Sequence, residues 1–418
     1  MQSVSNDRAV KVAVIGGGAA GMMAAGTALS MGANVTVFEH VGRLGKKLAI
    51  TGKGRCNVTN NCTREEFIQN VLSNPRFMYA PLSAFSPEDT VNFFEGLGVA
   101  LKTERGRRVF PVSDKAADIV SAMKKYCSGA DIVYEKVTKI LVNGGRAVGV
   151  RTDKDYAFDS VILATGGKSY SLTGSDGSGY KLASAVGHTV TELTPSLVPV
   201  ETYGSYCQRM QGLSLKNVAL RINDESGRTV YEDFGELLFT HFGMSGPMIL
   251  SATSHLRGFK LDTLTAEIDM KPALDERALD ARILSDFAKN PNKDFANSLG
   301  ALLPSKMIDV IIHDSKIDAH KKVNSITKDE RKRLVSSLKS LKIKLKRLRP
   351  IDEAIITSGG IAVKEISPKT MMSTKVRSLY FAGEVIDVDA YTGGYNLQIA
   401  FSTGYVSGMN AAGKDNLC

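Results

Sequence analysis

Cysteine and histidine are sparse in this 418-residue chain, and their spacing excludes the sites that they usually build. The five cysteines, Cys56, Cys62, Cys127, Cys207 and Cys418, include no CxxC pair and no regular framework. The six histidines show no metal-ligand spacing. We therefore expect no metal site and no disulfide framework. An odd, scattered set of cysteines is typical of a reducing compartment, which predicts the cytoplasm.

Membrane signals are also missing from the sequence. No N-terminal stretch combines a charged region, an apolar run and a cleavage site, so no secretory signal is expected. The run 12–29 carries no charge, but it holds four glycines among its first ten residues and directly follows a Val/Ile strand pattern. We interpret it as part of a nucleotide-binding unit rather than as a membrane helix, and expect no membrane partner.

The segment from Val10 to His40 has the order of elements that dinucleotide-binding proteins use. It predicts a buried strand at Val10–Ile15, a Gly16-x-Gly18-x-x-Gly21 turn, a helix at Ala19–Leu29, a second strand at Val35–Phe38 and an acid at Glu39. The glycines permit a tight turn, so that the helix N-terminus faces a pyrophosphate and the carboxylate takes the ribose hydroxyls. A mere turn between packed elements would leave Glu39 unexplained.

The next segment, VGRLGKKLAITGKGRCNVTN, favours FAD over NAD. NAD dehydrogenases do not need a second glycine-rich, basic stretch, whereas many FAD enzymes place one along the pyrophosphate and ribityl chain. Arg43 and Lys46 would supply charge to phosphate, and Gly52 and Gly54 would let the backbone lie close to a flat ring. No His or Cys lies in a recognised flavinylation motif, so we expect the FAD to be non-covalent.

Two later segments are predicted to return to the same crevice. Phe158–Gly167 predicts an apolar strand that ends at the carboxyl edge of the sheet, where such folds bind nucleotides. Leu379–Ala382 predicts another buried strand, after which Glu384 or Asp387 would reach ribityl hydroxyls. A helix over about 396–412 would point its positive end at the flavin N1–C2 carbonyl.

A second GxGxxG domain for NADPH is missing. The glycines of Gly174–Gly179 have the wrong order, and resemble instead the glycine turn of the fumarate-reductase superfamily before a helix at Tyr180–Val186. A nicotinamide donor would therefore have to come and go without a Rossmann domain of its own. Val137 has two open interpretations, a backbone contact to adenine or an ordinary residue in a strand within Asp131–Val142.

These motifs together resemble a known family. The pieces are GGGAAG, GRLGKKLAITGKGRCNVTN, ATGGKSY, TGSDGSGYKLA, LLFTHFGMSGPMIL, TSGGI and LYFAGEVIDVDAYTGGYNLQIAFSTGYVSG. They are similar to the BaiN-like flavoproteins, also described as YhiN-type or aminoacetone-oxidase-like. The resemblance runs from about Val10 to Ala412 and is weakest over Ala273–Arg349. It implies that residues 51–57 form part of the flavin pocket.

The predicted cofactor-binding set combines the residues argued above with those that the resemblance implies. It comprises Gly16, Gly18, Ala19, Ala20, Gly21, Glu39, Arg43, Gly45, Lys46, Thr51, Gly52, Gly54, Arg55, Cys56, Asn57, Val137, Ala164, Thr165, Gly166, Gly383, Glu384, Asp387, Gly394, Asn396, Leu397 and Gln398. No catalytic acid is identifiable. Tyr391, Tyr395 and His241 are candidates by position only, and His241 has the alternative of a satisfied structural histidine.

The expected architecture is α/β: a Rossmann-like FAD-binding domain interrupted by an inserted β-barrel-like domain with a small helical subdomain. Alternating apolar positions predict strands in the insert, and helical spacing predicts the subdomain. The resemblance implies the same arrangement. The expected boundaries are 1–193 and 357–418 for the FAD-binding domain, 194–272 and 336–356 for the β-rich domain, and 273–335 for the helical subdomain.

Positive charge is concentrated in residues 302–350, which hold fourteen Lys and Arg against five Asp and Glu, a surplus of nine where the whole chain has ten. A nucleic-acid face, a face for an anionic substrate and a solvated subdomain would all explain this surplus. No aromatic residue interleaves these charges, so the segment has no stacking platform of its own. Nucleic acid is therefore not the expected partner.

We expect an FAD-dependent oxidoreductase that passes a hydride through flavin N5 to a small organic acceptor. The resemblance covers reductases of unsaturated or keto compounds, bile-acid-like steroids among them, with NAD(P)H as the transient donor. It also covers an oxidase of small amines that uses oxygen. From a different class, a flavoprotein that modifies or binds tRNA through the basic insert is the alternative. The sequence leaves the substrate and the oligomeric state open.

Overall fold

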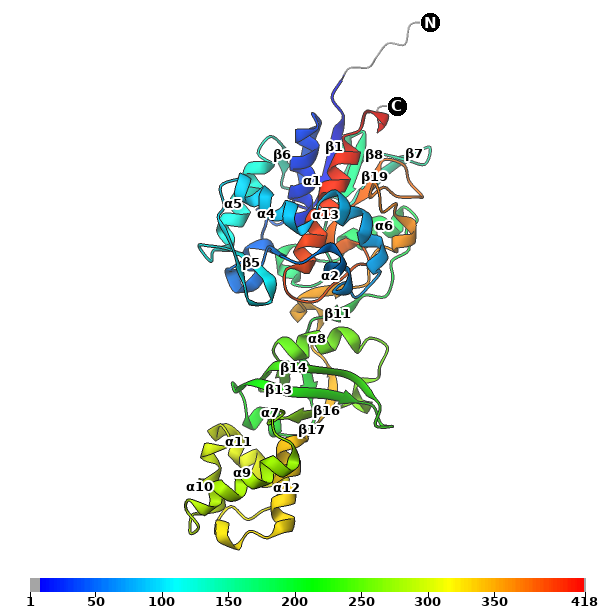
Figure 1. Cartoon of the computed structure of the whole chain (residues 1–418). Helices are drawn as coiled ribbons and strands as arrows, with labels where there is room; N and C mark the ends of the chain where they lie inside the picture. The colour runs from blue at the N-terminus through cyan, green and yellow to red at the C-terminus, as the bar shows by residue number, and fades with distance from the viewer. Residues whose placement is uncertain (1–7, 417–418) are drawn as a thin grey trace, which may run out of the picture. The chain divides into compact units, whose positions relative to one another are not determined.

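The computed structural model describes residues 8–416, which divide into two compact units. The first unit contains the residues to Ser196 and those from Ala354 onward, and the second contains Leu197–Glu353 (Figure 1). The expected α/β architecture with an inserted barrel is confirmed. The expected boundaries at 193/194 and 356/357 lie three residues away from the boundaries of these units.

A five-stranded parallel sheet, in the order β19-β10-β1-β2-β6, is the centre of the first unit. Its strands are β1 (Lys11–Ile15), β2 (Asn34–Phe38), β6 (Asp131–Val133), β10 (Ser160–Leu163) and β19 (Leu379–Phe381). Because all five run in one direction, their carboxyl ends gather at one edge of the sheet. The segments that follow β1, β2, β10 and β19 at this edge are the predicted cofactor segments.

Alternate residues of the strands face opposite sides of the sheet, and different elements cover the two sides. Val12 and Val14 of β1 pack with the helices α1 (Ala19–Ser30), α5 (Ala116–Tyr126) and α13 (Tyr395–Ala411). Ala13 and Ile15 pack instead with α6 (Ser178–Ala185) and with the antiparallel sheet β7-β8-β9. The strands of that sheet are β7 (Lys139–Asn143), β8 (Arg146–Arg151) and β9 (Asp155–Ala157).

The helices α1 and α13 lie side by side on the sheet (Figure 1). A Cβ atom at Gly404 would lie 2.5 Å from the Ala20 carbonyl oxygen, and one at Gly408 would lie 2.3 Å from that of Ala24. Glycine is therefore required where the backbones approach this closely. Since Gly404 matches Ala20 and Gly408 matches Ala24, the two helices run in the same direction, so their N-termini point the same way.

Smaller elements complete the first unit. These are β3 (Thr59–Asn60), β4 (Leu101–Glu104), β5 (Arg108–Pro111), β11 (Thr194–Ser196), β18 (Ile356–Ser358), α2 (Arg64–Gln69), α3 (Tyr79–Ala84) and α4 (Pro87–Gly96). The strands β3, β5 and β4 form an antiparallel sheet, and β11 pairs with β18. The sheet β3-β5-β4 was not predicted from the sequence. Asp131–Val142 was expected to be strand, whereas β6 ends at Val133 and β7 begins at Lys139.

The second unit is a closed barrel of six strands, in the order β12-β15-β14-β13-β16-β17, with helices that share its hydrophobic core. The strands are β12 (Val200–Thr202), β13 (Ser214–Asn223), β14 (Thr229–Phe239), β15 (Gly243–Ser245), β16 (Thr265–Asp269) and β17 (Leu341–Leu348). The helices are α7 (Tyr206–Arg209), α8 (Pro247–His255), α9 (Glu276–Ala288), α10 (Phe295–Ser298), α11 (Ser305–Ser315) and α12 (Lys328–Lys339). No helix within residues 8–416 is long and apolar enough to cross a membrane.

Candidate cofactor site

The glycine turn after β1 combines two glycines that the fold requires with one that leaves space. Gly16 has a φ of +104°, and a Cβ there would lie 2.5 Å from the carbonyl oxygen of Ala164. A Cβ at Gly21 would lie 1.8 Å from the Gly16 carbonyl oxygen. A Cβ at Gly18, in contrast, would meet nothing within 4 Å. The open space therefore lies at the N-terminus of α1, where Ala19 and Ala20 begin the helix and where a pyrophosphate is predicted.

Glu39 at the end of β2 ties this turn to the next segment. One of its carboxylate oxygens accepts a hydrogen bond from the backbone N–H of Gly17 and the other accepts one from that of Val41, each at 2.9 Å. The side chain is buried. Each oxygen has two lone pairs, so two acceptor positions remain for the predicted ribose hydroxyls.

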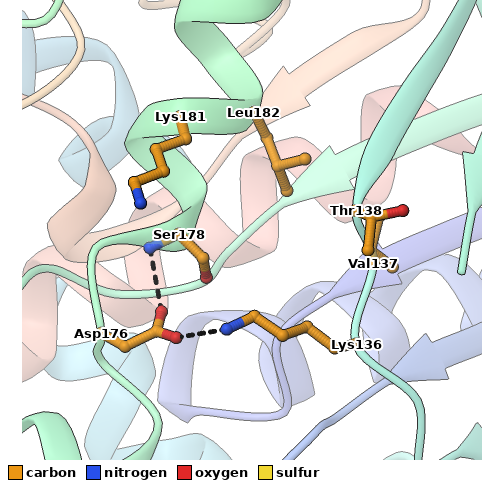
Figure 2. A pocket seen from close by; sticks show the side chains of 7 residues that line it. All are labelled: Lys136, Val137, Thr138, Asp176, Ser178, Lys181 and Leu182. Carbon is orange, nitrogen blue, oxygen red and sulfur yellow. Dashed lines mark hydrogen bonds and ion pairs between the residues drawn. The ribbon is translucent and has the colours of Figure 1, made fainter.

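A cavity of about 260 Å³ lies beside the segment between β6 and β7 (Figure 2). Its lining residues are Lys136, Val137, Thr138, Asp176, Ser178, Lys181 and Leu182. The Asp176 carboxylate accepts hydrogen bonds from the Lys136 ammonium at 2.7 Å and from the Ser178 backbone N–H at 2.9 Å. Although partial burial opposes the shift, these bonds lower the pKa of Asp176 to about 2.

His40 connects this cavity with Glu39. One ring nitrogen of His40 lies 3.8 Å from the Asp176 carboxylate, and the other lies 3.9 Å from the Glu39 carboxylate. Val137 is buried in the segment between β6 and β7 and belongs to neither strand. The His40 ring thus lies between the cavity and the carboxylate that is predicted to hold the adenosine ribose. A role for the Val137 backbone toward adenine stays a prediction.

The basic segment after β2 is attached to the glycine turn through its backbone. The N–H of Gly45 donates to the carbonyl oxygen of Gly17 at 2.8 Å. Arg43 is exposed and Lys46 is half-buried. Within the described part of the chain, no carboxylate forms an ion pair with either cation, so both remain available to a phosphate.

The stretch 48–57, which contains the short helix η1 (Leu48–Gly54), has an unusual backbone. Gly52, Lys53, Gly54 and Cys56 all have positive φ, at +58°, +58°, +83° and +60°. Left-handed conformations cost energy at Lys53 and Cys56, and such positions cluster at functional sites. Cys56 is buried, and its burial raises the pKa of its thiol to about 12. This thiol is protonated at neutral pH and has no thiolate character.

Arg55 has a different environment from the one predicted for a direct cofactor contact. Its guanidinium donates to the carboxylates of Glu104 and Asp114, and it lies 4.2 Å above the ring centre of Phe110. These contacts attach the stretch 48–57 to the sheet β3-β5-β4. The structure thus gives Arg55 a role in positioning this stretch, and its contact with a cofactor stays a prediction.

Glu384 is the centre of a partly buried cluster that the sequence did not reveal. Its carboxylate accepts from the Lys47 ammonium at 2.8 Å, from the Ser169 hydroxyl at 3.0 Å and from the Thr357 backbone N–H at 2.9 Å. These residues come from the stretches after β2, β10 and β19 and from β18. Because three partners already occupy the carboxylate, Glu384 holds the segments together, and the prediction that it reaches ribityl hydroxyls stays untested.

Three buried oxygens on the predicted cofactor segments have no hydrogen-bond partner. Of six such side-chain atoms among residues 8–416, these are Asn57 Oδ1, Thr165 Oγ1 and Asp387 Oδ1. Buried polar atoms are normally paired, so orphaned ones indicate a missing partner. All three residues were predicted from the sequence to contact FAD, whose ribityl hydroxyls and ring N–H are donors. The residues present therefore fit FAD.

The N-terminus of α13 supplies backbone donors. Its N-cap is Gly394, with a φ of +99°, and a Cβ there would lie 2.3 Å from the Thr59 carbonyl oxygen. The first bond within the helix runs from the Gln398 N–H to the Gly394 carbonyl oxygen at 3.1 Å. The N–H groups of Asn396 and Leu397 precede that bond and have no partner within the helix. Only these two fit the predicted contact with a flavin.

Gln398 has a structural role that its position alone did not indicate. Its side-chain oxygen accepts from the hydroxyls of Thr59 and Thr90, at 2.6 and 2.7 Å. Its amide nitrogen donates to the Phe85 carbonyl oxygen and the Ser402 hydroxyl. The side chain is fully buried, so it joins α13 to β3 and α4 rather than facing a ligand.

The three candidate acids lie in different places. Tyr395 begins α13 and packs edge-on against Phe67 at 5.1 Å. Its burial, together with the nearby Cys62 and Glu66, raises the pKa of its hydroxyl to about 12. Tyr391 precedes the same helix and is half-buried. His241 is exposed in the turn between β14 and β15 of the second unit, where its ring lies 5.0 Å from that of Phe242.

Sequence reasoning missed Lys47, Asp176 and Ser169. Each stands next to a residue or turn that was selected: Lys47 beside Lys46, Asp176 within the glycine turn and Ser169 after the ATGG motif. The sequence does not distinguish the roles of these three residues from those of their neighbours; only the contacts in the folded chain do. The four described cysteines are all free, and Cys418 lies outside the described residues.

Comparison with known proteins places this site in a family. The family described as HI0933-like protein Rossmann domain matches residues 10–410. A 3-dehydro-bile acid delta(4,6)-reductase of Clostridium scindens is 30% identical over 410 residues, which cover 96% of this chain and 99% of the relative. A ribosomal RNA dihydrouridine synthase of Escherichia coli (strain K12) is 28% identical over 397 residues, which cover 94% of this chain and 95% of the relative.

A solved structure supports the fold. The 3-ketosteroid-delta4-(5alpha)-dehydrogenase of Rhodococcus jostii, in complex with 4-androstene-3,17-dione, has a TM-score of 0.53 and 15% identity, and the match covers 98% of both chains. At this identity the likeness concerns the fold alone. Since the family match spans nearly the whole chain and includes every predicted cofactor segment, the chain belongs to the HI0933-like family of FAD-dependent oxidoreductases.

Proposed function

We propose that the protein reduces a carbon–carbon double bond that is conjugated with a carbonyl group, using FAD and a transient NAD(P)H donor. The observation that carries this proposal is the chemistry that two relatives have in common. One is a reductase of 4,6 double bonds in a 3-dehydro bile acid, and the other makes dihydrouridine, which is uridine with its pyrimidine double bond reduced. In both compounds the reduced bond is conjugated with a carbonyl.

The chain's own residues would hold the cofactor at the carboxyl edge of the sheet. The N-terminus of α1 would bind the pyrophosphate, with Arg43 and Lys46 nearby, and Glu39 would accept from the ribose hydroxyls. Asn57, Thr165 and Asp387 would pair their orphaned oxygens with cofactor donors. When bound, FAD supplies a two-electron carrier that takes a hydride from the donor and gives it to the acceptor.

The same edge would favour the reduced cofactor and supply a proton. The N–H groups of Asn396 and Leu397 would donate to the ring edge where negative charge develops on reduction. Tyr395 is one candidate donor to the product carbon by its position at the start of α13, although its pKa of about 12 makes it a weaker acid than an ordinary tyrosine. Tyr391 and His241 stay candidates by position.

An anaerobic reduction experiment tests this function. NADH or NADPH should bleach the visible absorption of the flavin, and 2-cyclohexenone should then restore it by accepting the hydride. Cyclohexanone, which has the carbonyl but no double bond, is the matched control and should leave the flavin reduced. Restoration by both ketones would refute the proposed bond specificity. Bleaching by a small amine, with neither pyridine nucleotide effective, would establish the amine-oxidase alternative instead.

A further inference from the structure

The barrel places aromatic rings beside the basic strand β17. Tyr203 directly follows β12, and its backbone N–H donates to the Lys344 carbonyl oxygen at 3.0 Å. The Lys346 ammonium lies 5.8 Å from the Tyr203 ring centre. Tyr203 is 49% exposed, which is a large exposure for an aromatic side chain. Residues 302–350 contain no aromatic residue, so this ring is contributed by a neighbouring strand.

A second ring and cation lie on the same edge of the barrel. The Arg349 guanidinium lies 4.6 Å above the ring centre of Phe242, in the turn between β14 and β15. Phe242 in turn contacts His241, which is exposed. The Phe242 carbonyl oxygen accepts from the Thr202 N–H at 3.1 Å, which fixes this turn beside β12. The two ring–cation pairs are therefore neighbours across β12.

The edge carries a surplus of positive charge. Glu201 on β12 accepts from both Arg347 and Arg349 at 2.8 Å, and Glu353 forms a further ion pair with Arg349. With Lys346, three cations therefore face two carboxylates. The Arg347 side chain is still 68% exposed. No carboxylate lies within ion-pair distance of Lys346 among the described residues. We define the barrel-edge surface as Tyr203, His241, Phe242, Lys346, Arg347 and Arg349.

We propose that the barrel-edge surface binds a single-stranded segment of RNA. Exposed rings offer faces on which unpaired bases stack, and the cations beside them neutralise backbone phosphates. A small anionic substrate would need cations alone, so the rings favour a polynucleotide. This inference rests on the proposed function, because a uracil base has the carbonyl-conjugated double bond that the enzyme would reduce.

The test measures RNA binding by fluorescence anisotropy of a labelled, uridine-containing RNA 12-mer with no self-complementarity. The variants are Tyr203→Ala, which changes no charge, and Lys346→Glu. The matched control is Lys328→Glu, which reverses an exposed cation of the same basic segment on α12. Flavin content and melting temperature of each variant establish that it is folded.

We expect Tyr203→Ala to weaken binding about tenfold, since one stacked base contributes on the order of 1–3 kcal/mol. Lys346→Glu should weaken binding by at least as much at low salt, whereas Lys328→Glu should change it less than threefold. The same RNA annealed to its complement should bind more weakly, because paired bases cannot stack on the rings. No binding by the wild type, or equal weakening by Lys328→Glu and the two surface variants, would overturn the inference.

These outcomes are distinguishable from failure of the proposed function. If wild-type protein reduces 2-cyclohexenone but does not bind the RNA, the RNA inference alone fails. If it binds the RNA through Tyr203 and Lys346 but reduces no conjugated double bond, the proposed reaction fails and the surface stands.

Discussion

The glycine turn allows cofactor binding and folding to be separated by substitution. Gly18 has ordinary extended dihedral angles, with φ −78° and ψ −168°, and a Cβ there meets nothing within 4 Å. In Gly18→Val, the apoprotein should therefore lose only about 1 kcal/mol, from a poorer helix N-cap. The new side chain would fill the space predicted for the pyrophosphate. Loss of two charge-assisted hydrogen bonds, at about 1.5–3 kcal/mol each, lowers the affinity for FAD about 10²–10⁴-fold.

Gly21→Ala is the matched control, because its cost falls on the fold. A Cβ at Gly21 would lie 1.8 Å from the Gly16 carbonyl oxygen, which is a backbone atom that cannot rotate away. Overpacking of this kind costs about 1–3 kcal/mol, and α1 would have to move away from β1. We therefore expect this variant to lower the stability of the apoprotein as well as its affinity for FAD.

Two measurements on apoprotein separate these effects. Calorimetric titration with FAD gives the dissociation constant, and urea unfolding without FAD gives the stability. Wild-type protein should be stabilised by FAD through mass action, and Gly18→Val should lose this stabilisation while its apoprotein unfolds near the wild-type urea concentration. If Gly18→Val bound FAD within tenfold of wild type, the open space at the N-terminus of α1 would not be the pyrophosphate site.

Three further predictions concern the N-terminus of α13, Cys56 and the acid stability of the first unit. Asn396→Pro removes a backbone N–H donor, but it also removes the side-chain hydrogen bonds to Ala390. Asn396→Ala removes only the side-chain bonds and is therefore the control. Dye-equilibration titration should give the proline variant a flavin reduction potential about 30–65 mV below that of the alanine variant. Cys56→Ser should keep flavin content and turnover, because a protonated thiol with a pKa of about 12 carries no redox step. Although burial opposes it, Lys375 and Thr189 lower the pKa of Glu365 to about 2 from 4.5. Its stabilising contribution is complete above pH 4.5 and is lost as the pH falls toward 2, so Glu365→Gln should flatten acid unfolding over that range.

The sequence carried enough information for the central fold and for the position of the cofactor segments. Gly16, Gly18 and Gly21 between two apolar strands, followed by Glu39, predict one βαβ unit, because glycine permits the tight turn and an acid at that position is typical of a contact to ribose. The order of the motifs then predicted which strands end at the same carboxyl edge of the parallel sheet. The elements that were not predicted are short: β3 has two residues and β4 has four, too few for a periodic pattern.

Individual roles within the segments were less predictable, since they depend on which side chains meet. Glu384 was selected for its position after β19, yet its contact with Lys47, 337 residues earlier in the chain, decides what it does. Arg55 was selected as part of residues 51–57, which the resemblance places in the flavin pocket, and the ring that it contacts in the structure is Phe110. Pairings between distant segments leave no periodicity in the sequence and require the folded chain.

The net charge of the barrel surface also depends on pairings between distant segments. Residues 302–350 have a surplus of nine positive charges, but the whole second unit has only four, with 25 Lys and Arg against 21 Asp and Glu. The balance arises because acids on other elements pair with these cations, as Glu267 pairs with Lys342 and Asp280 with Arg331. A sequence count therefore overstates the basic surface, while it misses the rings that other strands bring to it. Cations that keep their exposure beside a ring, as Lys346 does beside Tyr203, are the ones left for a polyanion.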